Sequence, residues 1–359
     1  DIIYGYIDIT PFEEIIIEDP YFQRLRFIFQ NSSAYLTYPS NQLTRFSHSL
    51  GVMHIGGQMF ENGIRNANDN VKSEFLALSK DILIKRITAY EITSTYDQIK
   101  EYWEQNQDVF GKLGINSLTS EERFVCSIYI QSLRIACLCH DIGHLPFSHI
   151  FEMAIDDFNS RNNEHLASSL TQDCIQEIQK QFKTSLKQTV KATDLHELIG
   201  AYLLCSIFKS LPKEKKDIER DVFKLSLGLA IEMFLHEKRD YNLHEEDTKS
   251  LFSCFYSIIS SDLDADRLDY ILRDAKSSGI NLGDFDYTRI IMHLELVKRG
   301  KAFTVIPSGK SISSIDQFFN YRYLMYEYVY YHHNVAKYDG LLIEIIGLIF
   351  KEIIIDNNA

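Results

Sequence analysis

The chain has 359 residues and a formal net charge of −13, with 45% hydrophobic and 13% aromatic residues. This length allows a substantial core, in one large domain or two smaller ones. The acidic balance argues against sequence-nonspecific nucleic-acid binding, which needs an excess of Lys and Arg against phosphate. A small anionic substrate is compatible with this negative charge, because a metal ion and a few local basic residues can make the electrostatic potential within a pocket positive.

The proline and cysteine contents indicate the fold class and the cellular compartment. Only 6 prolines occur, and long stretches without Pro or Gly predict an all-α, mainly helical protein. The 6 cysteines form no CxxC pair, so we interpret them as buried reduced thiols of a cytoplasmic protein. No signal peptide is visible, and the start at Asp1 is compatible with a fragment of a longer chain. The apolar run at residues 341–350 is far shorter than the ~20 residues of a membrane span and predicts a buried helix.

The first elements are predicted from local signals. Residues 2–9 alternate loosely around Gly5 and predict a small N-terminal β-hairpin or edge strand. Thr10 suits the N-cap and Pro11 the first position of a helix. Residues 20–30 predict a second short helix.

The rest of the chain is expected to form one domain over residues 1–359. Residues 61–120 are polar and weakly periodic, and we interpret them as an inserted segment with one or two helices. Residues 155–195 are also polar and are expected to be peripheral. A short β element is predicted near residues 300–306. The remaining predictions are apolar helices at 45–60, 121–140, 195–208, 251–275 and 314–350, and a charged loop at 211–221.

The run CHDIGHLPFSH at residues 139–149 has the strongest chemical signal. His140 and Asp141 are adjacent, and His144 lies one helical turn after His140 on the same face. Gly143 and Pro146 mark the end of the helix. A divalent metal needs imidazole nitrogens and carboxylate oxygens from several directions, so other elements must supply the remaining ligands.

Candidates for those ligands lie far away in the sequence. His48 follows Arg45 at a predicted helix start, and Asp266, Tyr270 and Asp274 form a stripe on an apolar helix. Buried carboxylates are costly unless they are paired or bound to a metal. Taken singly, His48 is more often a satisfied polar residue, and the aspartates could be N-caps with surface salt bridges. Together, their order favours a metal site.

A His, a His-Asp pair and a late Asp in this order resemble the HD-domain superfamily of metal-dependent phosphohydrolases. The flanking residues resemble one branch, the dNTP triphosphohydrolases. The resemblance covers about residues 4–335. The blocks that carry it are DPYFQRLRFIFQ, RFSHSLGV, HDIGHLPFSH, DADRLDYILRD, NLGDFDY and RYLMYEYVYYHHNV.

The resemblance implies roles by position. It implies four metal ligands for a divalent ion (Mn, Mg, Fe or Zn): His48, His140, Asp141 and Asp266. It implies catalytic roles for His144, His196 and Asp274. It implies substrate contacts from Gln30, Arg45, His149, Arg267, Tyr270, Arg322 and Tyr330. The general acid is expected in an HE pair, which favours His196-Glu197 over His165, where Leu166 follows.

Simple chemistry agrees with several of these roles. A triphosphate needs several cations, and three arginines can supply bidentate contacts: Arg45, Arg267 and Arg322. The spacing of Arg322, Tyr326 and Tyr330 predicts one helix face, although core packing with a surface arginine explains it too. Tyr270 could press on C2′ of a deoxyribose and exclude a 2′-hydroxyl.

Three departures bear on function. The spacing from His48 to His140 is long for the branch, and Tyr331 stands where the branch has Gln, which affects base recognition. Gln23 and Arg26 match an allosteric nucleotide site of the animal enzyme, so an allosteric nucleotide is a further expectation. By resemblance we also expect a homo-oligomer.

The predicted function is therefore hydrolysis of a dNTP to a deoxynucleoside and triphosphate. Two alternatives stay open. The first is an HD-type phosphodiesterase or nuclease that acts on a cyclic nucleotide or single-stranded nucleic acid. The second is a non-catalytic nucleotide-sensing module. The acidic charge speaks mildly against nucleic acid as a partner.

Overall fold

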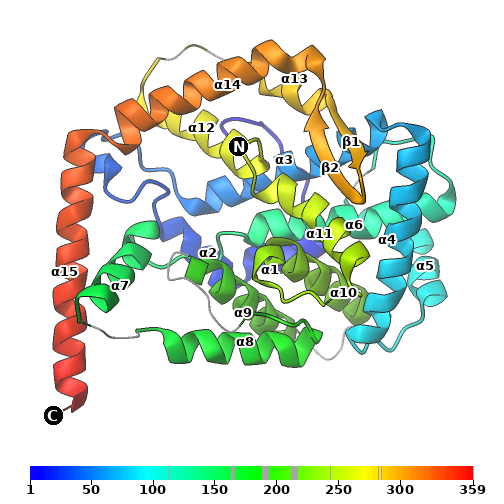
Figure 1. Ribbon diagram of the computed structural model, residues 1–359, viewed down its shortest axis with the longest axis horizontal. Helices are drawn as coiled ribbons and strands as arrows, with labels where there is room; N and C mark the ends of the chain where they lie inside the picture. The colour runs from blue at the N-terminus through cyan, green and yellow to red at the C-terminus, as the bar shows by residue number, and fades with distance from the viewer. Residues whose placement is uncertain are drawn as a thin grey trace.

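The computed structural model describes residues 1–111, 113–162, 166–187, 194–211, 217–242, 244–281, 283 and 285–358. It confirms the mainly helical fold (Figure 1). The α-helices are α1 Pro11–Glu18, α2 Pro20–Gln23, α3 Arg45–Asn66, α4 Asp69–Ala89, α5 Tyr96–Gln105, α6 Ser120–Cys139, α7 His149–Asn162, α8 Ser168–Phe182, α9 Leu195–Ser210, α10 Asp217–Phe234, α11 Glu246–Ile259, α12 Ala265–Ser278, α13 Tyr287–Met292, α14 Ile312–Met325 and α15 His333–Asn358. The strands are β1 Leu294–Arg299 and β2 Ala302–Pro307. Single-turn helices lie at Arg24–Phe27, Ala34–Leu36, Gln107–Val109, His236–Lys238 and Gly309–Ser311, and a π-helical turn lies at Tyr326–Tyr330.

Helix α6 is the centre of the core. Its residues are all buried from Phe124 to Cys139, and it packs mainly against α3 and α10. A helix that is covered all round holds its ends in fixed positions, and His140 caps the C-terminal end of α6. All 6 cysteines are buried and unpaired, as predicted.

Helices α3 and α12 approach each other closely at Gly51. A Cβ atom at this position would lie 1.9 Å from Oδ1 of Asp269 on α12. Only glycine permits this approach, and it brings the start of α3 with His48 against the first turns of α12. Two segments more than 200 residues apart in the chain therefore meet beside the end of α6.

The predicted β element near residues 300–306 agrees with the antiparallel pair β1 and β2. The N-terminal β-hairpin was wrong, because residues 2–9 form no strand. Gly5 lies in a turn with φ +69°, and Tyr4 donates its hydroxyl to Asp269 at 2.8 Å. This segment is therefore held by side-chain contacts with α12, and not by backbone hydrogen bonds to a neighbouring strand.

The signals at the start of the chain were more accurate for helices. Thr10 and Glu13 form a capping box, and Pro11 occupies the first turn of α1. Residues 61–120 contain the end of α3 and both α4 and α5. Helix α4 buries Phe75 and Leu83, so this segment contributes to the core. Its status as an insertion stays a prediction.

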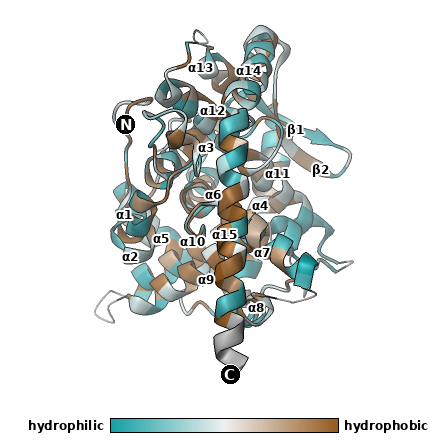
Figure 2. Cartoon of the chain, turned by 90° about the vertical axis from the view of Figure 1, so that its left-hand side faces the viewer, coloured by the Kyte–Doolittle hydropathy of each residue, from teal (hydrophilic) through white to brown (hydrophobic). Residues whose placement is uncertain are grey.

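Helix α15 differs from its prediction. It runs along one edge of the molecule, and Figure 2 shows its apolar bands facing outward. Phe350 contacts Phe151 and Phe158 of α7, but Leu341 is 52% exposed and Leu348 is 60% exposed. The predicted buried helix is thus covered on one side only. Among the described residues, every helix is too short or too polar to span a membrane.

Candidate active site

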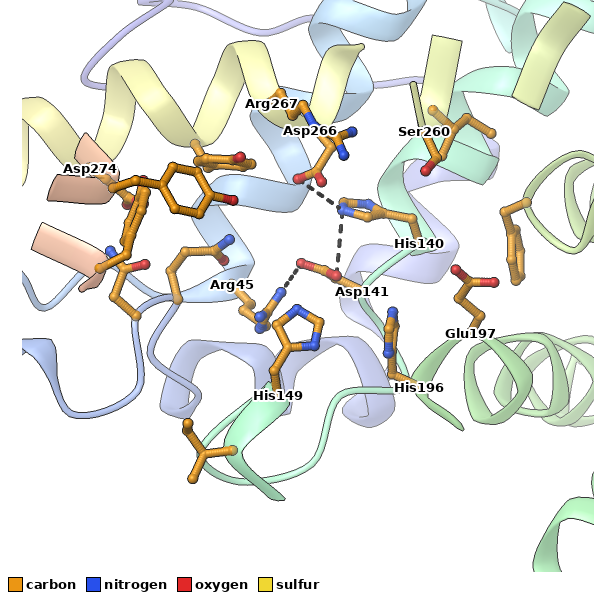
Figure 3. Close-up of a pocket in the computed structure, with 18 of the residues that line it drawn as sticks. Arg45, His140, Asp141, His149, His196, Glu197, Ser260, Asp266, Arg267 and Asp274 are labelled. Carbon is orange, nitrogen blue, oxygen red and sulfur yellow. Dashed lines mark hydrogen bonds and ion pairs between the residues drawn. The ribbon is translucent and has the colours of Figure 1, made fainter. Parts of the chain in front are cut away.

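Four predicted metal ligands converge from three helical elements. Nε2 of His48 lies 3.0 Å from Oδ1 of Asp266 and 3.5 Å from Oδ2 of Asp141. Nε2 of His140 lies 3.5 Å from Oδ1 of Asp141 and 3.7 Å from Oδ1 of Asp266. Figure 3 shows His140, Asp141 and Asp266 facing one another at the pocket wall. Two imidazole nitrogens and two carboxylates form a donor set that suits a divalent ion.

The orientation of both imidazoles fits a metal ion. Nδ1 of His48 lies 2.7 Å from Oδ2 of Asp269, and Nδ1 of His140 lies 2.7 Å from the carbonyl oxygen of Cys137. Each acceptor makes Nδ1 the donor, so Nε2 is the atom that would bind an ion. Both Nε2 atoms are buried and make no hydrogen bond within the described part of the chain. An ion between them would satisfy both nitrogens.

Asp269 is a functional residue that the sequence analysis missed. Arg273 contacts both of its carboxylate oxygens at 2.8 Å, and both side chains are fully buried. Although burial alone raises the pKa of Asp269, its hydrogen bonds with Arg273 and His48 lower it. The four-residue spacing of Asp269 and Arg273 in an apolar helix was the signal that could have identified this buried pair.

Arg45 lies beside the same site. It forms an ion pair with Asp141, and its Nε donates to Oγ of Ser148 at 2.9 Å. Burial by itself raises the pKa of Asp141, but the guanidinium of Arg45 and the neighbouring histidines hold it well below its usual range. Asp141 is therefore charged, and its contact with Arg45 fixes its orientation.

The turn after α6 is held by unusual backbone contacts. A Cβ at Gly143 would lie 1.9 Å from the carbonyl oxygen of His196, so only glycine lets α9 pack here. Phe147 and Ser148 have φ values of +66° and +57°, which non-glycine residues rarely adopt. The guanidinium of Arg24 donates to two carbonyl oxygens of the turn. Together these contacts place His144 against His196.

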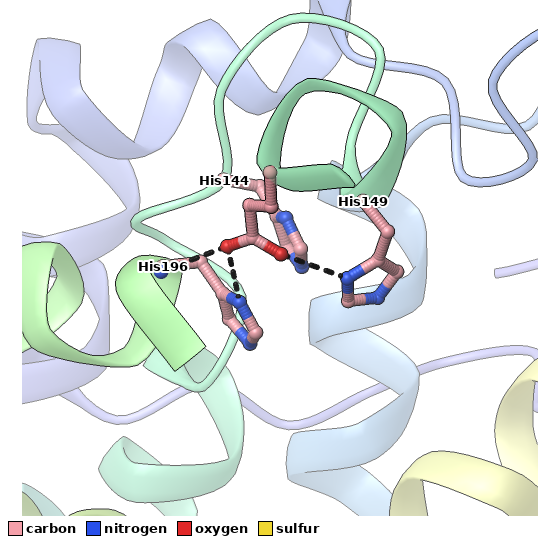
Figure 4. A group of neighbouring side chains, drawn as sticks. His144, His149 and His196 are labelled. Atoms are coloured by element: carbon pink, nitrogen blue, oxygen red, sulfur yellow. Dashed lines mark hydrogen bonds and ion pairs between the residues drawn. The ribbon is translucent and has the colours of Figure 1, made fainter. Parts of the chain in front are cut away.

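Figure 4 shows a second histidine cluster. It lies beside the candidate metal ligands, since Nε2 of His144 is 3.1 Å from Oδ1 of Asp141. The rings of His144 and His196 stack with centroids 4.0 Å apart and planes 9° apart, and His149 meets His144 edge-on at 4.5 Å. Glu152 links two of them: Oε1 lies 2.7 Å from Nδ1 of His196, and Oε2 lies 3.1 Å from Nδ1 of His149. Glu152, three residues after His149 on α7, was not identified from the sequence.

Both groups border one pocket of about 510 Å³. The residues that line it are Gln30, Asn31, Arg45, His140, Asp141, His149, Ile150, His196, Glu197, Phe234, Tyr256, Ile259, Ser260, Asp266, Arg267, Tyr270, Asp274, Tyr326, Tyr330 and Tyr331. Most of the predicted substrate residues are therefore brought together. Arg322 is not among the lining residues, and its guanidinium lies 5.8 Å from the ring centroid of Tyr326. His165 lies outside the described residues.

One end of the pocket is aromatic and polar. Tyr330 donates its hydroxyl to Oδ2 of Asp274 at 2.9 Å, and the rings of Tyr270 and Tyr330 meet edge-on at 6.1 Å. Burial raises the pKa of Asp274 to about 6. In Figure 3, Asp274 and His196 lie at opposite sides of the pocket, so Asp274 is remote from the histidine cluster. The catalytic role of Asp274 stays a prediction.

A π-helical turn shapes this end. The backbone N–H of Tyr331 donates to the carbonyl of Tyr326 at 2.9 Å, which adds one residue to the helical turn. The extra residue interrupts the helix face that was predicted from the spacing of Arg322, Tyr326 and Tyr330. Tyr326, Tyr330 and Tyr331 all line the pocket. Such turns occur often at functional sites.

The opposite end contains residues that the sequence analysis did not assign: Glu197, Tyr256 and Ser260. Oε2 of Glu197 lies 2.5 Å from Nζ of Lys238, so its charge is neutralised. Arg267 lines the pocket nearby and contacts Asp264, the N-cap of α12.

Gln23 and Arg26, the residues matched to an allosteric site, contact each other. Nε of Arg26 donates to Oε1 of Gln23 at 2.7 Å, and the guanidinium of Arg26 lies 3.5 Å from the ring centroid of Phe46. Neither residue lines the pocket.

Comparison with known proteins agrees with the resemblance stated above. No family model matches the chain. An HD domain-containing protein of Acanthamoeba polyphaga mimivirus is 24% identical over 352 residues, which cover 97% of this chain and 56% of that protein. The deoxynucleoside triphosphate triphosphohydrolase SAMHD1 of Gallus gallus is 23% identical over 340 residues, which cover 92% of this chain and 42% of that protein. The chain spans about half the length of these curated relatives.

Solved structures agree on the fold. A phosphohydrolase from Bacteroides thetaiotaomicron is similar with a TM-score of 0.56 at 23% identity, over 96% of this chain and 57% of that one. A protein from Aquifex aeolicus is similar with a TM-score of 0.54 at 23% identity, over 98% of this chain and 64% of that one. The predicted resemblance to the HD superfamily, and to its dNTP triphosphohydrolase branch, is confirmed at this low identity.

Proposed function

We propose that this chain, a homologue of HD-domain phosphohydrolases, is a metal-dependent enzyme that hydrolyses a dNTP to a deoxynucleoside and triphosphate. One observation carries the proposal. Three of the four candidate metal ligands (His140, Asp141 and Asp266), the carboxylate-backed His196 and a tyrosine-lined end all border the same pocket. A pure binding module would need neither the metal ligands nor the histidine pair.

The candidate ligands fit a divalent ion because one ligand atom each of His48, His140 and Asp141 lies within 4.8 Å of the others. Oδ1 of Asp266 lies 3.0 Å from Nε2 of His48 and 3.7 Å from Nε2 of His140. A bound ion supplies positive charge where negative charge develops on the reacting phosphate. Mn, Mg, Fe and Zn all accept such a donor set. Arg45 and Arg267, which line the pocket, would hold phosphate oxygens beside it. A phosphate contact by Arg322 stays a prediction.

His196 is the proposed proton donor. In the reaction, water attacks the α-phosphorus, the bond from phosphorus to O5′ breaks, and O5′ takes a proton from His196. The oxygen of the water stays on the triphosphate. Glu152 engages Nδ1 of His196 at 2.7 Å, which leaves Nε2 for the leaving group and stabilises the charged ring. His144 and His149 flank this ring and would contact the phosphates.

The tyrosine-lined end would hold the deoxynucleoside. Oε1 of Gln30 and Oδ1 of Asp274 are buried and make no hydrogen bond among the described residues, so both can accept from a sugar hydroxyl. Tyr270 lies on the same side, where it would face C2′ and exclude a 2′-hydroxyl. Tyr330 and Tyr331 offer rings for the base.

Separation of products tests the proposal. The protein is incubated with each dNTP and Mn²⁺ or Mg²⁺, and we expect deoxynucleoside and triphosphate in equal amounts, both lost in Asp141→Asn. A folded, metal-loaded sample that releases neither product from any dNTP would contradict it. Release of a nucleoside monophosphate and pyrophosphate would also contradict it. Metal-dependent degradation of labelled single-stranded DNA or RNA would support the phosphodiesterase alternative instead.

The relatives suggest three further proposals. The SAMHD1 homologues make an allosteric nucleotide at Gln23 and Arg26 a hypothesis for this chain. A homo-oligomer is proposed on the resemblance, and a cytoplasmic location on the six buried, unpaired cysteines.

A further inference from the structure

Helix α15 carries an apolar stripe that faces away from the rest of the molecule (Figure 2). Four residues make up this stripe, at steps of three and four along the helix: Tyr338, Leu341, Ile345 and Leu348. Each of them is at least 37% exposed, whereas Val335 and Ile346 on the inner face are buried. Alternating steps of three and four are typical of the seam between two helices that pack side by side.

A groove lies beside the N-terminal half of the stripe. Its volume is about 220 Å³, and most of its lining is apolar, with side chains from three segments: Leu36, Phe147, Tyr338, Leu341, Leu342 and Ile345. Leu36 and Phe147, which form the wall opposite α15, are themselves 50% and 44% exposed. The groove is therefore open to solvent and has the lining that an aliphatic side chain from another helix would need.

The C-terminal half of the stripe supplies the matching projection. Leu348 is 60% exposed and is not among the residues that line the groove. A groove and a projection that are displaced along one straight helix cannot meet within a single chain. Two-fold symmetry brings them together, because an antiparallel second copy places each projection over the other groove. With the axis at Ile345, Leu348 of one copy lies opposite Leu342 of the other.

Charged residues at the ends of the stripe agree with an antiparallel pair. Lys337 precedes the stripe and Glu352 follows it, and both are exposed. Glu344, which lies between them, forms an ion pair with Arg161 of α7 at 2.9 Å. In an antiparallel pair, Lys337 of each copy faces Glu352 of the other, whereas a parallel pair would place like charges side by side.

We propose that α15 forms the interface of a homodimer, in which the α15 helices of two copies pack antiparallel about a two-fold axis near Ile345. Leu348 of each chain fills the groove of the other, and Lys337 pairs with Glu352 at both ends. Association is driven by removal of the exposed apolar stripe from water. The homo-oligomer expected from the resemblance thereby gains a defined surface, which is independent of the proposed reaction.

Sedimentation over a range of protein concentrations tests the interface. We expect the wild type to reach twice the mass of one chain, and Leu348→Glu to raise the dissociation constant by about 100-fold or more, because it places an unpaired carboxylate in the partner's groove. Ile84→Glu is the matched control: it adds the same charge at a 41% exposed position on α4, at the opposite edge of the molecule (Figure 1), and should keep the wild-type dissociation constant. Circular dichroism checks that both variants are folded.

Charge reversal tests the direction of the pair. Lys337→Glu and Glu352→Lys should each weaken the dimer by about threefold to tenfold, because each places like charges opposite each other. The double variant should regain most of the lost affinity, since the opposite charges then face each other again. A double variant that is weaker than either single variant would overturn the antiparallel arrangement.

Disulfide cross-linking tests the position of the axis. All six native cysteines are buried, so an introduced surface cysteine is the thiol that oxidation can reach. Only a residue at the two-fold axis lies beside its own copy. Ile345→Cys should therefore form a covalent dimer on mild oxidation, whereas Leu341→Cys, which faces Ile349 of the other chain, should not. Equal cross-linking of both variants would overturn the proposed register.

Two further outcomes overturn the dimer itself. A wild-type chain that stays monomeric at every concentration would leave the α15 face to a different protein. A dimer with the same dissociation constant in Leu348→Glu as in the wild type would place the interface elsewhere on the surface. Neither outcome depends on which substrate the enzyme cleaves.

Discussion

Nδ1 of His48 lies 2.7 Å from Oδ2 of Asp269, and this contact turns Nε2 of the imidazole toward Asp141 and Asp266. Asp269 is itself held by Arg273 and by the hydroxyl of Tyr4 at 2.8 Å. A candidate metal ligand at the start of α3 thus takes its orientation from α12 and from the N-terminal segment. Such outer contacts normally set affinity for the ion.

Asp269→Asn should therefore weaken binding of a divalent ion beside His48 by about 10- to 100-fold. The amide has the same shape as the carboxylate but carries no charge to hold Nδ1 as a donor. A Mn²⁺ titration would measure the dissociation constant. Asp262→Asn, in the exposed turn just before α12, is the matched control and should leave it unchanged. Equal affinities in a variant that melts like wild type would refute the orienting role.

Glu152→Gln should lower kcat by about 100-fold with a small change in KM, because the carboxylate acts on the proton donor and not on substrate binding. Asp156→Asn lies one turn later on α7, is exposed, and should behave like wild type. Steady-state kinetics with the preferred dNTP would measure both parameters. A rise in KM at unchanged kcat would assign Glu152 to substrate binding instead.

Gly143→Ala should destabilise the fold by about 1 to 3 kcal/mol or more, because its Cβ has no space beside the His196 carbonyl. Activity should fall as well, since α9 must move and carries His196 with it. Gly340→Ala is the matched control. No atom lies within 4 Å of its Cβ position on α15, so alanine should stabilise the helix by about 0.5 to 1 kcal/mol. Denaturant unfolding would compare the two, and equal stabilities would argue against the close approach.

Asp274→Asn should stabilise the folded state in a pH-dependent way. Burial raises the pKa of Asp274 to about 6, whereas an unfolded aspartate titrates near about 3.9. The folded state therefore binds the proton more tightly, and its stability falls as pH rises from about 4 to 6. Asn does not ionise, so the variant should exceed wild type by up to about 3 kcal/mol near pH 8, with the difference vanishing toward pH 4. A pH-independent difference in unfolding free energy would contradict this assignment.

Tyr270→Ala should reduce the preference for a dNTP over the matching ribonucleotide by about tenfold or more, because removal of the ring opens space beside C2′. The ratio of kcat/KM values for the two substrates measures this effect. Tyr323→Ala, an exposed residue outside the pocket lining, serves as the control. Unchanged discrimination would place sugar selection elsewhere in the pocket.

The residue types at the centre of the site could be predicted from sequence. Adjacent His140 and Asp141, a preceding His48 and a late Asp266 have metal-binding chemistry wherever they lie in the chain, and the structure brings the four together. The helical class also followed from composition and from caps such as Thr10, because these signals act within one turn of helix.

Contacts between distant elements were not predictable in the same way. Asp269 and Glu152 were missed because their roles depend on meeting His48 and His196 across helix interfaces. The predictions of a strand at residues 2–9 and of a buried helix α15 were wrong for the same reason. Whether a segment forms a strand or becomes buried depends on the elements that pack against it.

The candidate metal ligands could thus be chosen from the sequence, because donor atoms keep their chemistry in any fold. The tertiary structure decided which nitrogen of His48 faces the ion, which carboxylate supports His196, and that both clusters border one pocket. The physical reason is packing: Gly51 and Gly143 let helices approach within the reach of one hydrogen bond, and only the assembled core fixes that distance.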